Sequence, residues 1–403
     1  MKNLKVATFV PFYKNFIKGQ VEGIAKYVSR VDVYLHYNVL SEISRLPVPI
    51  QYFRYVRRFT KGNIIDNTST PKNVKVNIIS SFYLIPDGSN PFVGERLCRK
   101  FFNYVANRDY DILHAHIPWP QGFVAMKISK DTDVPYVVTV HGINEISDII
   151  NNSRNFLQQK IKGKVITVLN EADHIITVSY KNKKLLVDAL GDHLNNKITV
   201  IPNGFDKELF RPIPQEYARK MLGLPQNKQI ILNVAYLEPI KGHDFLLKAL
   251  SIVRNSGKDF LCIVIGDGSQ RRYLERLATR LGISDKMIFL GERPHSEIPL
   301  WMNAADLFVL PSLSEGNPTV MFEALGVGLP FVGTRVGGVP EIITSEDYGL
   351  LCEPKNPEDL AEKILISLGK EWDREKIRKY AEQFTWEKVA RQVVDIYKKL
   401  LTR

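Results

Sequence analysis

The chain has 403 residues, more than one ordinary hydrophobic core accommodates, so we expect two domains. Hydrophobic residues make up 44% of the sequence, as in a globular protein, and no run of 18 apolar residues is present to span a bilayer. The net charge of +12 is uneven: residues 1–200 hold 27 Lys and Arg against 16 Asp and Glu, whereas residues 201–403 hold 28 against 27. A basic first half predicts an anionic partner there, such as a membrane surface, a nucleic acid or a phosphorylated substrate.

Cysteine usage and the N-terminus indicate the compartment. Cys98, Cys262 and Cys352 lie far apart in the sequence and form no Cys-x-x-Cys motif, which favours a reducing environment. The apolar run in "MKNLKVATFVPFYKNF" is too short for a signal peptide. We therefore expect a cytoplasmic protein whose basic first half is able to adhere to the inner face of a membrane.

Short apolar, β-branched runs alternate with amphipathic stretches along the whole chain. In the first half the expected strands cover residues 4–10, 31–37, 74–80, 111–117, 135–141, 174–179 and 197–202. In the second half they cover residues 229–237, 260–266, 286–291, 307–312 and 330–334, with helices such as 269–281 and 357–368 between or after them. Nearly continuous apolar strands that alternate with helices predict parallel sheets covered on both faces. Two such series predict two doubly wound α/β domains.

The division between the two series falls in residues 201–217, "IPNGFDKELFRPIPQEY", which are rich in turn formers and have no clean period. The last segment, residues 384–403, has apolar residues at helical spacing.

Residues 312–323, "SLSEGNPTVMFE", follow the carboxyl end of an expected strand, where ligands of open α/β sheets bind. A helix should begin near Pro318 or Thr319, so the backbone N–H groups of residues 317–320 would form an anion site. Glu323 lies about one turn inside this helix, and its carboxylate could accept hydrogen bonds from a pair of hydroxyls such as those of a ribose. Glu315 precedes the helix. Alternatively, Glu315 is a solvated loop acid and Glu323 a surface helix acid.

Other strand-to-helix junctions of the second half carry glycine or lysine. Lys241 lies in such a loop and could meet a diphosphate, although a loop lysine is commonly solvated. Gly266, in "VIGDGSQ", belongs to an incomplete dinucleotide fingerprint that a tight turn explains equally well. Gly337 and Gly338 either let the backbone approach a ligand or supply a turn with positive φ.

Histidines are the candidate site residues of the first half. His114 and His116 lie on an expected strand, where a histidine is commonly a core residue, whereas His141 at a strand end is better placed to face a ligand. Two Asp-x-Asp pairs, 109–111 and 131–133, precede strands, at the wrong end of a parallel sheet for an active site, and we interpret them as turn acids. No His/Cys cluster has metal-ligand spacing and no Gly-x-x-x-x-Gly-Lys loop is present, so we expect no metal site.

Taken together, these runs resemble a known family. "SLSEGNPTVMFEALGVGLPFVGTRVGGVPEII" resembles the Glu-x7-Glu signature of the retaining glycosyltransferases of family 4, which have the GT-B fold. The likeness extends over nearly all of residues 200–370, through "IPNGFDKELFRP", "EPIKGHDFLLKAL", "VIGDGSQRRYLERLATRLGI", "IFLGERP", "NAADLFVLPS" and "GLLCEPKNPEDLAEKI". Weaker echoes, "DILHAHIPWPQG", "PYVVTVHGIN" and "ADHIITVSYKNKK", carry it into the first half.

The resemblance implies a fold and a reaction. It implies two Rossmann-like domains that face each other across a cleft: an acceptor domain at 1–203, with the C-terminal helix 384–403 packed back on it, and a nucleotide-sugar domain at 204–383. A hexosyl unit would pass from a nucleoside-diphosphate sugar to a lipid-linked or polysaccharide acceptor with retention of anomeric configuration. The resemblance implies no metal and no other cofactor.

The resemblance also implies a role for each matching residue. Glu323 would hold the ribose hydroxyls, and Glu315 would contact the transferred sugar and aid the charge that develops at C1. Lys241 and the amides of the helix start would hold the diphosphate, and His141 would lie near the donor sugar and the acceptor. The expected donor-binding residues are Glu323, Lys241, Asn317, Pro318, Thr319, Val320, Gly266 and Tyr236; the expected acceptor-binding residues are His116 and Gly19.

The sequence departs from the family pattern at two places. Family members commonly have an arginine before the lysine, and here Tyr236 takes its place, which could cost about 1.5–3 kcal/mol of hydrogen bonding to the donor unless another basic residue such as Arg335 substitutes. Many members also have a Gly-Gly loop after the first strand. Here that region has only Gly19 and Gly23, so the loop must close over its ligand differently.

Two further hypotheses stay open: a non-catalytic nucleotide-sugar binding subunit, motivated by Tyr236, and a nucleotide-sugar epimerase. No nucleic-acid motif accompanies the positive charge, so we expect no nucleic-acid partner. The aromatic and basic stretch Tyr52–Lys61 is the expected membrane contact, although it could equally be an ordinary basic loop.

Overall fold

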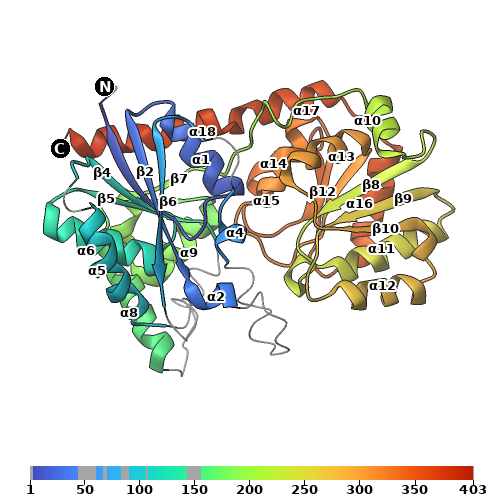
Figure 1. Ribbon diagram of the computed structural model, residues 1–403. Helices are drawn as coiled ribbons and strands as arrows, with labels where there is room; N and C mark the ends of the chain where they lie inside the picture. The colour runs from blue at the N-terminus through green and yellow to red at the C-terminus, as the bar shows by residue number, and fades with distance from the viewer. Residues whose placement is uncertain are drawn as a thin grey trace. The chain divides into compact units, whose positions relative to one another are not determined.

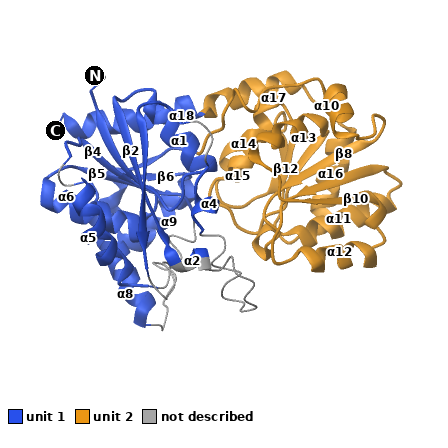
Figure 2. Cartoon of the chain, viewed as in Figure 1, with its two compact units in different colours: residues 1–202, 386–403 blue, residues 203–385 orange. Residues whose placement is uncertain are grey.

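The computed structural model describes residues 3–43, 60–66, 70–82, 90–105, 108–142 and 156–402. The chain forms two compact units (Figure 2): unit 1 comprises residues 1–202 and 386–403, and unit 2 comprises residues 203–385. The sequence placed the two boundaries at 203/204 and 383/384, and the units meet at 202/203 and 385/386. Among the described helices, none is long and apolar enough to cross a bilayer.

Unit 1 is built on a seven-stranded sheet in the order β3-β2-β1-β4-β5-β6-β7 (Figure 1). Its strands are β1 (Lys5–Phe9), β2 (Arg30–Asn38), β3 (Val74–Ser81), β4 (Ile112–Ala115), β5 (Tyr136–Val140), β6 (His174–Thr177) and β7 (Ile198–Val200), and each pairs with its neighbours in parallel. Its described helices are α1 (Asn15–Ala25), α2 (Val39–Ile43), α4 (Lys61–Ile64), α5 (Val93–Val105), α6 (Phe123–Thr132), α8 (Phe156–Glu171), α9 (Tyr180–Leu190) and α18 (Trp386–Leu401).

Unit 2 repeats the same plan with a six-stranded parallel sheet in the order β10-β9-β8-β11-β12-β13. Its strands are β8 (Gln229–Val234), β9 (Phe260–Ile265), β10 (Met287–Gly291), β11 (Leu307–Leu310), β12 (Phe331–Thr334) and β13 (Gly349–Cys352). Its helices are α10 (Gln215–Leu222), α11 (His243–Asn255), α12 (Arg271–Arg280), α13 (Ile298–Ala304), α14 (Thr319–Gly326), α15 (Val339–Ile342), α16 (Pro357–Gly369) and α17 (Arg374–Ala381).

The prediction of two doubly wound, parallel α/β domains is therefore confirmed, and both strand orders reverse once, as in Rossmann-like folds. Each predicted strand is present, although most are shorter by a few residues. The sequence prediction missed β13. This edge strand has four residues and begins with a glycine, so it offers too short an apolar run to be recognised.

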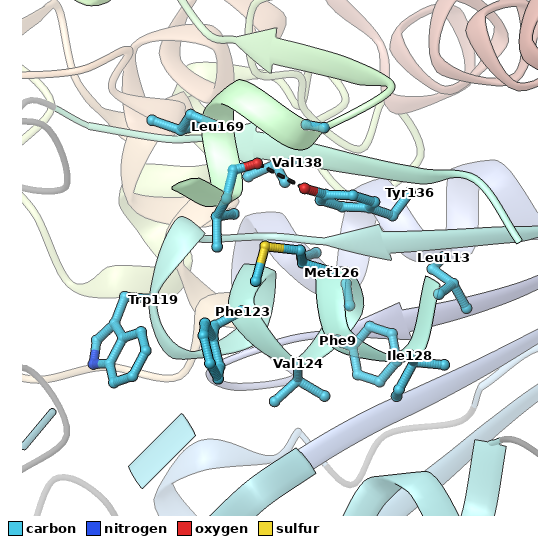
Figure 3. Close-up of a cluster of buried hydrophobic side chains, with 14 of the residues drawn as sticks. Phe9, Leu113, Trp119, Phe123, Val124, Met126, Ile128, Tyr136, Val138 and Leu169 are labelled. Carbon is cyan, nitrogen blue, oxygen red and sulfur yellow. Dashed lines mark hydrogen bonds between the residues drawn. The ribbon is translucent and has the colours of Figure 1, made fainter. Parts of the chain in front are cut away.

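Apolar side chains cover both faces of the unit 1 sheet. One face packs under α5, α6 and α8, with Phe9, Leu113 and Val138 among its fully buried residues (Figure 3). Tyr136 belongs to the same cluster, and its hydroxyl donates to the carbonyl of Val168 at 2.8 Å, so the one polar atom of this side chain is satisfied. The inner strands β1, β4, β5 and β6 are buried on both faces almost throughout, which explains why they are mostly apolar, whereas the edge strand β3 has exposed residues.

The C-terminal helix α18 completes the other face of this sheet. It lies beside α1, and Val389, Val393 and Tyr397 join the core that α1 forms with the strands (Figure 1). Gly19 of α1 permits this close packing, because a Cβ at Gly19 would lie 2.3 Å from Nε1 of Trp386. Trp386 accounts for this glycine without a ligand.

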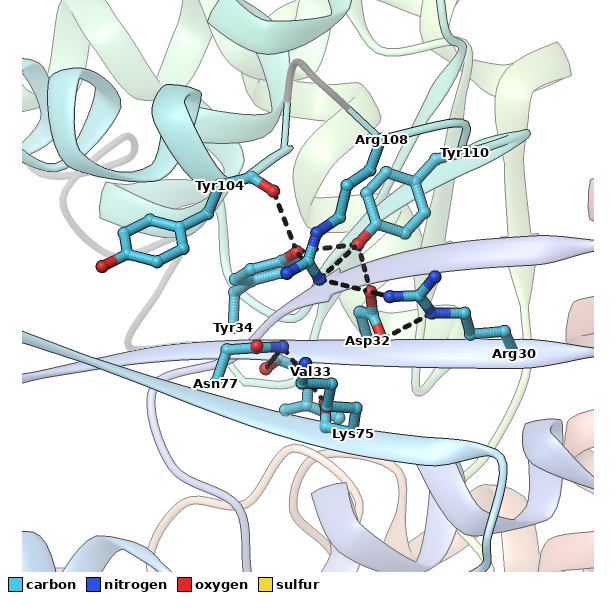
Figure 4. A network of polar contacts seen from close by, with 9 residues as sticks. All are labelled: Arg30, Asp32, Val33, Tyr34, Lys75, Asn77, Tyr104, Arg108 and Tyr110. Atoms are coloured by element: carbon cyan, nitrogen blue, oxygen red, sulfur yellow. Dashed lines mark hydrogen bonds and ion pairs between the residues drawn. The ribbon is translucent and has the colours of Figure 1, made fainter.

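A buried acid, Asp32, lies near the start of β2, at the amino ends of the strands of the unit 1 sheet. Asp32 is fully buried and accepts hydrogen bonds from Arg30, Arg108 and Tyr110, whose hydroxyl also contacts that of Tyr34 at 2.7 Å (Figure 4). Burial alone would raise the pKa of Asp32, but the hydrogen bonds from its neighbours hold that pKa below its usual range. The Asp109 and Asp111 side chains lie at the same end and bond Lys5, at 2.6 Å to its ammonium and 2.7 Å to its backbone N–H.

The tight contact at Gly19 predicts the effect of a single methyl group. Gly19→Ala should lower the free energy of unfolding by about 1–3 kcal/mol, because the added Cβ must displace the buried ring of Trp386. Gly163 is the matched control. It lies within α8 with nothing within 4 Å of its Cβ position, so Gly163→Ala should stabilise by about 0.5–1 kcal/mol. Denaturant unfolding of both variants measures this difference, and equal effects would contradict the packing role of Gly19.

Candidate functional site

The strand order locates the candidate site in each unit. The strand order of a doubly wound sheet reverses at one point. The loops that follow the two strands at this point leave in opposite directions, and ligands bind beyond the carboxyl ends of these two strands. The reversal lies between β1 and β4 in unit 1 and between β8 and β11 in unit 2. The residues that follow these strands are therefore the ones to inspect.

In unit 2 the loop after β8 is pressed against the end of β11. Gly242 has a φ of +65°, and a Cβ there would lie 2.1 Å from the carbonyl oxygen of Pro311. The N–H of Leu313 donates to the carbonyl of Ile240 at 2.8 Å. These two contacts bring Lys241, between Ile240 and Gly242, to the loop that follows β11.

Lys241 and Glu315 form an ion pair at this point. The Lys241 ammonium lies 2.5 Å from Oε1 of Glu315, and the hydroxyl of Ser312 donates to the same oxygen at 2.6 Å. The side chain of Glu315 is only 9% exposed, so it is not a solvated loop acid. A carboxylate this far from water requires such partners. The sequence predicted both residues as site residues but not their contact.

A glycine turn holds the backbone of the Glu315 loop. Gly337 has a φ of +56°, and a Cβ there would lie 2.0 Å from the carbonyl oxygen of Glu315. Gly338 donates its N–H to the carbonyl of Gly316 at 2.7 Å. This Gly-Gly turn therefore contacts protein backbone, and the positive φ and the close approach explain the glycine at 337 without a ligand.

Helix α14 begins at Thr319, as the sequence predicted, and no side chain caps its first turn. Asn317 fixes the approach to it: its Oδ1 accepts from the N–H of Asn203 at 2.9 Å, and its carbonyl accepts from Nδ2 of Asn203 at 2.7 Å. Pro318 is buried, while Thr319 and Val320 are partly exposed. Because the first N–H groups of a helix have no intrahelical acceptor, the start of α14 offers donors to an anion.

Glu323, in the second turn of α14, has a partner that the sequence analysis missed. Nε2 of His295 lies 2.8 Å from Oε1 of Glu323, whose side chain is 9% exposed. His295 begins a short 3-10 turn, His295–Glu297, soon after β10, and its ring packs on Phe210 with 5.2 Å between centroids. A histidine just beyond the carboxyl end of a strand was the available signal, since the same reasoning had selected His141.

Three other candidates of unit 2 have simpler surroundings. Gly266 has a φ of +136°, and a Cβ there would lie 2.0 Å from the carbonyl oxygen of Ala235, so strand packing alone requires a glycine. Tyr236 is 54% exposed. Arg335, the expected substitute for the family arginine, lies 3.4 Å from Glu353 in an exposed ion pair.

In unit 1 the segments that follow β1, β4 and β5 place the rings of Phe16, His116 and His141 next to one another. His116 follows β4 and His141 follows β5, and Nδ1 of His116 lies 3.3 Å from Nε2 of His141. Phe16 packs on the His141 ring, 5.0 Å away between centroids. His116 is fully buried whereas His141 is partly exposed, so His141 is the more accessible of the two predicted histidines.

His114 is a core residue, as expected of a histidine on an apolar strand. Its Nδ1 lies 2.6 Å from the hydroxyl of Tyr397 in α18, and its Nε2 lies 2.7 Å from that of Thr139. The rings of His114 and His116 stack 4.5 Å apart. Burial lowers the pKa of both His114 and His141 to about 3 and that of His116 well below its usual range, so all three are neutral at pH 7.

The loop after β1 closes without the Gly-Gly pair of the family pattern. The N–H of Tyr13 donates to the carbonyl of Ile64 at 2.7 Å, and the N–H of Asp66 donates to the carbonyl of Tyr13 at 2.8 Å. Lys18 of α1 adds an ion pair with Asp66 at 3.0 Å. Residues 64–66 therefore brace this loop. Among the described residues, no group of three or more His, Cys, Asp or Glu side chains is arranged to hold a metal ion.

The neutral histidines predict acid sensitivity. Folded His114 stays neutral until its pKa of about 3, whereas the unfolded chain takes up a proton below its ordinary pKa of about 6.5. The contribution of this buried neutral histidine to the free energy of unfolding is fully present above about pH 6.5. It falls as the pH is lowered, and at pH 5 the loss is about 2 kcal/mol for this residue alone. Urea unfolding at pH 7 and pH 5 measures the difference, which should shrink in His114→Gln.

Because the comparison is made within each variant, a general loss of stability in His114→Gln does not affect it. The exposed His193, which bonds Asn170 at 3.0 Å, supplies the control, and His193→Gln should keep the full difference between the two pH values. An unfolding free energy of the parent chain that is the same at both pH values would contradict the burial of neutral histidine.

Two family models match the chain. The model of glycosyl transferases group 1 matches residues 214–384, within unit 2. The model of glycosyltransferase family 4 matches residues 66–209, mostly within unit 1. Together they include Lys241, Glu315, Glu323 and His141.

Curated relatives agree with these matches. An uncharacterized glycosyltransferase of Methanocaldococcus jannaschii is 30% identical over 304 residues, which cover 74% of this chain and 78% of that protein. A D-inositol 3-phosphate glycosyltransferase of Corynebacterium aurimucosum is 27% identical over 394 residues, which cover 89% of each. A putative teichuronic acid biosynthesis glycosyltransferase of Bacillus subtilis is 33% identical over 256 residues, 63% of this chain and 60% of that protein.

Solved structures share the fold over the whole chain. The sucrose-phosphate synthase of Thermosynechococcus elongatus superposes with a TM-score of 0.77 at 19% identity and covers 99% of both chains. The Anabaena protein HepE, solved in complex with UDP-glucose, superposes with a TM-score of 0.72 at 22% identity and covers 98% of this chain and 100% of its own. With two Rossmann-like units, matches in both and relatives along its length, the chain belongs to glycosyltransferase family 4, a family of GT-B glycosyltransferases.

Proposed function

We propose that the protein is a retaining glycosyltransferase that moves a hexosyl unit from a nucleoside-diphosphate sugar to a lipid-linked or polysaccharide acceptor. One observation carries this proposal. At the strand-order reversal of unit 2, a lysine, an uncapped helix start and two nearly buried acids lie on adjoining segments. This set supplies cationic and N–H donors for a diphosphate and carboxylates for hydroxyl groups.

Lys241 and the start of α14 would bind the diphosphate. A lysine ammonium has three donors, so Lys241 can keep its bond to Glu315 and still donate to phosphate oxygens. The N–H groups of Thr319 and Val320 would add a second set of donors. As the bond between C1 of the sugar and the β-phosphate oxygen breaks, negative charge grows on that phosphate, and preorganised donors stabilise it there.

The two acids would bind the sugar and the ribose. Glu315 would accept from a hydroxyl of the transferred sugar and stabilise the positive charge at C1, and Glu323 would accept from the ribose hydroxyls. Two structures of HepE, with UDP and with UDP-glucose, support a nucleotide-sugar donor for a chain of this fold. Because Lys241 and the helix amides can stabilise the negative charge of the leaving group, we propose that the reaction needs no metal.

The acceptor would bind to unit 1 near His141. Its ring is partly exposed, packs on Phe16 and is backed by the buried His116, which would orient it. Because Nε2 of His141 already contacts Nδ1 of His116, the acceptor would lie against the exposed part of the ring. The oxygen of its hydroxyl forms the new bond to C1 of the sugar, while its proton passes to the departing phosphate or to solvent. Gly19 has no place in this proposal, because Trp386 covers it.

An anionic or membrane-bound acceptor suits the basic first half of the chain. Among the relatives, the D-inositol 3-phosphate glycosyltransferases are named for a phosphorylated acceptor. The predicted contact, Tyr52–Lys61, lies outside the described residues apart from Thr60 and Lys61. Unit 1 offers a second aromatic and basic surface: Phe92 and Phe156 are 60% and 64% exposed, and the Lys160 ammonium lies 5.4 Å and 4.6 Å from their rings. We propose that this surface meets the cytoplasmic face of a membrane.

A non-catalytic nucleotide-sugar binding subunit is the second candidate, because Tyr236 stands where family members commonly have arginine. It predicts donor binding without transfer to any acceptor. An epimerase would convert the donor with no acceptor present.

Nucleotide binding is the first test. Thermal unfolding with millimolar UDP, ADP and GDP, and with UDP-glucose and GDP-mannose, should show stabilisation of the parent chain by one base in preference to the others. Glu323→Ala should lose this stabilisation, while EDTA should leave it unchanged in the parent chain. Stabilisation of neither form by any nucleotide would count against the donor site. Stabilisation that Glu323→Ala retains in full would count against the role of Glu323.

Vesicle sedimentation tests the membrane surface. The protein should bind vesicles that contain about a third phosphatidylglycerol more than vesicles of phosphatidylcholine alone, and the difference should weaken with added salt. The double variant Phe92→Ser, Phe156→Ser should reduce binding several-fold, because it removes both exposed rings beside Lys160. Tyr217 and Met221, which are 55% and 59% exposed in unit 2, serve as control positions for the same exchange to serine. Equal binding to both kinds of vesicle would refute the proposed surface.

A further inference from the structure

We propose that His295 is a positioning residue for donor recognition: its Nε2–H holds Oε1 of Glu323 and thereby orients the carboxylate toward the ribose hydroxyls. The proposal rests on the role of Glu323 in the proposed function and adds a residue to that site. His295 and Glu323 come from different elements, the 3-10 turn after β10 and helix α14, so their 2.8 Å contact depends on the packing of unit 2.

The ring of His295 is held in place by the protein. It packs on Phe210, which is 1% exposed and belongs to the core of unit 2, with 5.2 Å between centroids and 55° between ring planes. The turn that carries it follows Pro294, whose carbonyl accepts from the N–H of Glu297 at 2.9 Å. Although the His295 side chain is 40% exposed, its backbone and one ring face are thus fixed.

Glu323 depends on a donor of this kind. Its carboxylate sits on a side chain with three rotatable bonds, and at 9% exposure water cannot surround it. An ionised carboxylate has about four acceptor positions. Within the described part of the chain, the bond from His295 is the one side-chain hydrogen bond that Glu323 makes. It fixes the plane of the group and leaves Oε2 to accept from a neighbouring pair of hydroxyls.

The bond does not require a charged histidine. The carboxylate can only accept, so Nε2 must carry a proton, and both the neutral Nε2–H tautomer and the imidazolium meet this condition. His295 therefore acts by orienting the carboxylate of Glu323. Its removal should weaken the binding of a ligand in proportion to the contribution that the ribose hydroxyls make to the affinity.

Substitutions at position 295 separate the two contacts of the ring. His295→Phe keeps an aromatic ring against Phe210 but removes the donor, whereas His295→Gln can place an N–H near the position of Nε2 without a ring. The probes are UDP, ADP and GDP, each compared with its 2′,3′-dideoxy form by calorimetry. This comparison isolates the part of the affinity that comes from the ribose hydroxyls.

The parent chain should bind its preferred ribonucleotide at least about tenfold more tightly than the dideoxy form, as expected when hydroxyls bond a charged group. His295→Phe should lose most of this preference, while its affinity for the dideoxy form stays within about twofold of the parent. His295→Gln should recover the preference in large part. In turnover assays His295→Phe should raise KM for the donor more than it lowers kcat.

The outcomes separate the inference from the function on which it rests. Loss of the preference in Glu323→Gln but not in His295→Phe would overturn the positioning role alone. An unchanged preference in Glu323→Gln would overturn the ribose role of Glu323 itself. Equal losses in His295→Phe and His295→Gln would overturn the hydrogen-bond role. The exposed His193 in unit 1 provides the matched control, since His193→Phe should leave every affinity unchanged, and circular dichroism verifies that each variant is folded.

Discussion

Backbone-to-backbone contact at the carboxyl ends of the unit 2 strands is the constraint on which the candidate site depends. Gly242 touches Pro311, and Gly337 touches Glu315, at distances that leave no room for a side chain. These contacts join three separate loops into one rigid surface, and Lys241 and Glu315 meet because of them. A polar site built on such contacts needs little reorganisation when a ligand arrives, which is what electrostatic stabilisation of a transition state requires.

Among the described residues, each acid of this surface makes its side-chain hydrogen bonds through one oxygen, Oε1. Oε1 of Glu315 bonds Lys241 and Ser312, and Oε1 of Glu323 bonds His295. A buried carboxylate without a partner would be costly, and one with every lone pair occupied could bind nothing. Unit 1 places neutral groups in its buried polar cluster. Burial keeps His114, His116 and His141 uncharged, and these side chains bond hydroxyl groups and one another.

Local patterns in the sequence were enough to predict the sheets and to select candidate residues at the ends of their strands, because a strand, the loop after it and the next helix are contiguous in a doubly wound fold. Glu315, Glu323 and Lys241 were found in this way. Contacts between distant segments could not be predicted: His295 reaches Glu323 from another loop, and Gly19 is covered by Trp386 from the far end of the chain. The burial of His116 likewise follows from the rings of His114 and His141 on either side of it.

Helix α18 has a consequence for how the molecule is made. Because residues 386–401 pack into the core of unit 1 while residues 203–385 form unit 2, unit 2 is in effect inserted within unit 1. During synthesis, unit 2 has all of its residues before unit 1 receives its last helix. Until then the cores that Val393 and Tyr397 fill stay open, and His114 lacks its hydroxyl partner. Unit 1 is thus the last part to become complete, so a ribosome that stops early releases a chain with a finished unit 2 and an unfinished unit 1.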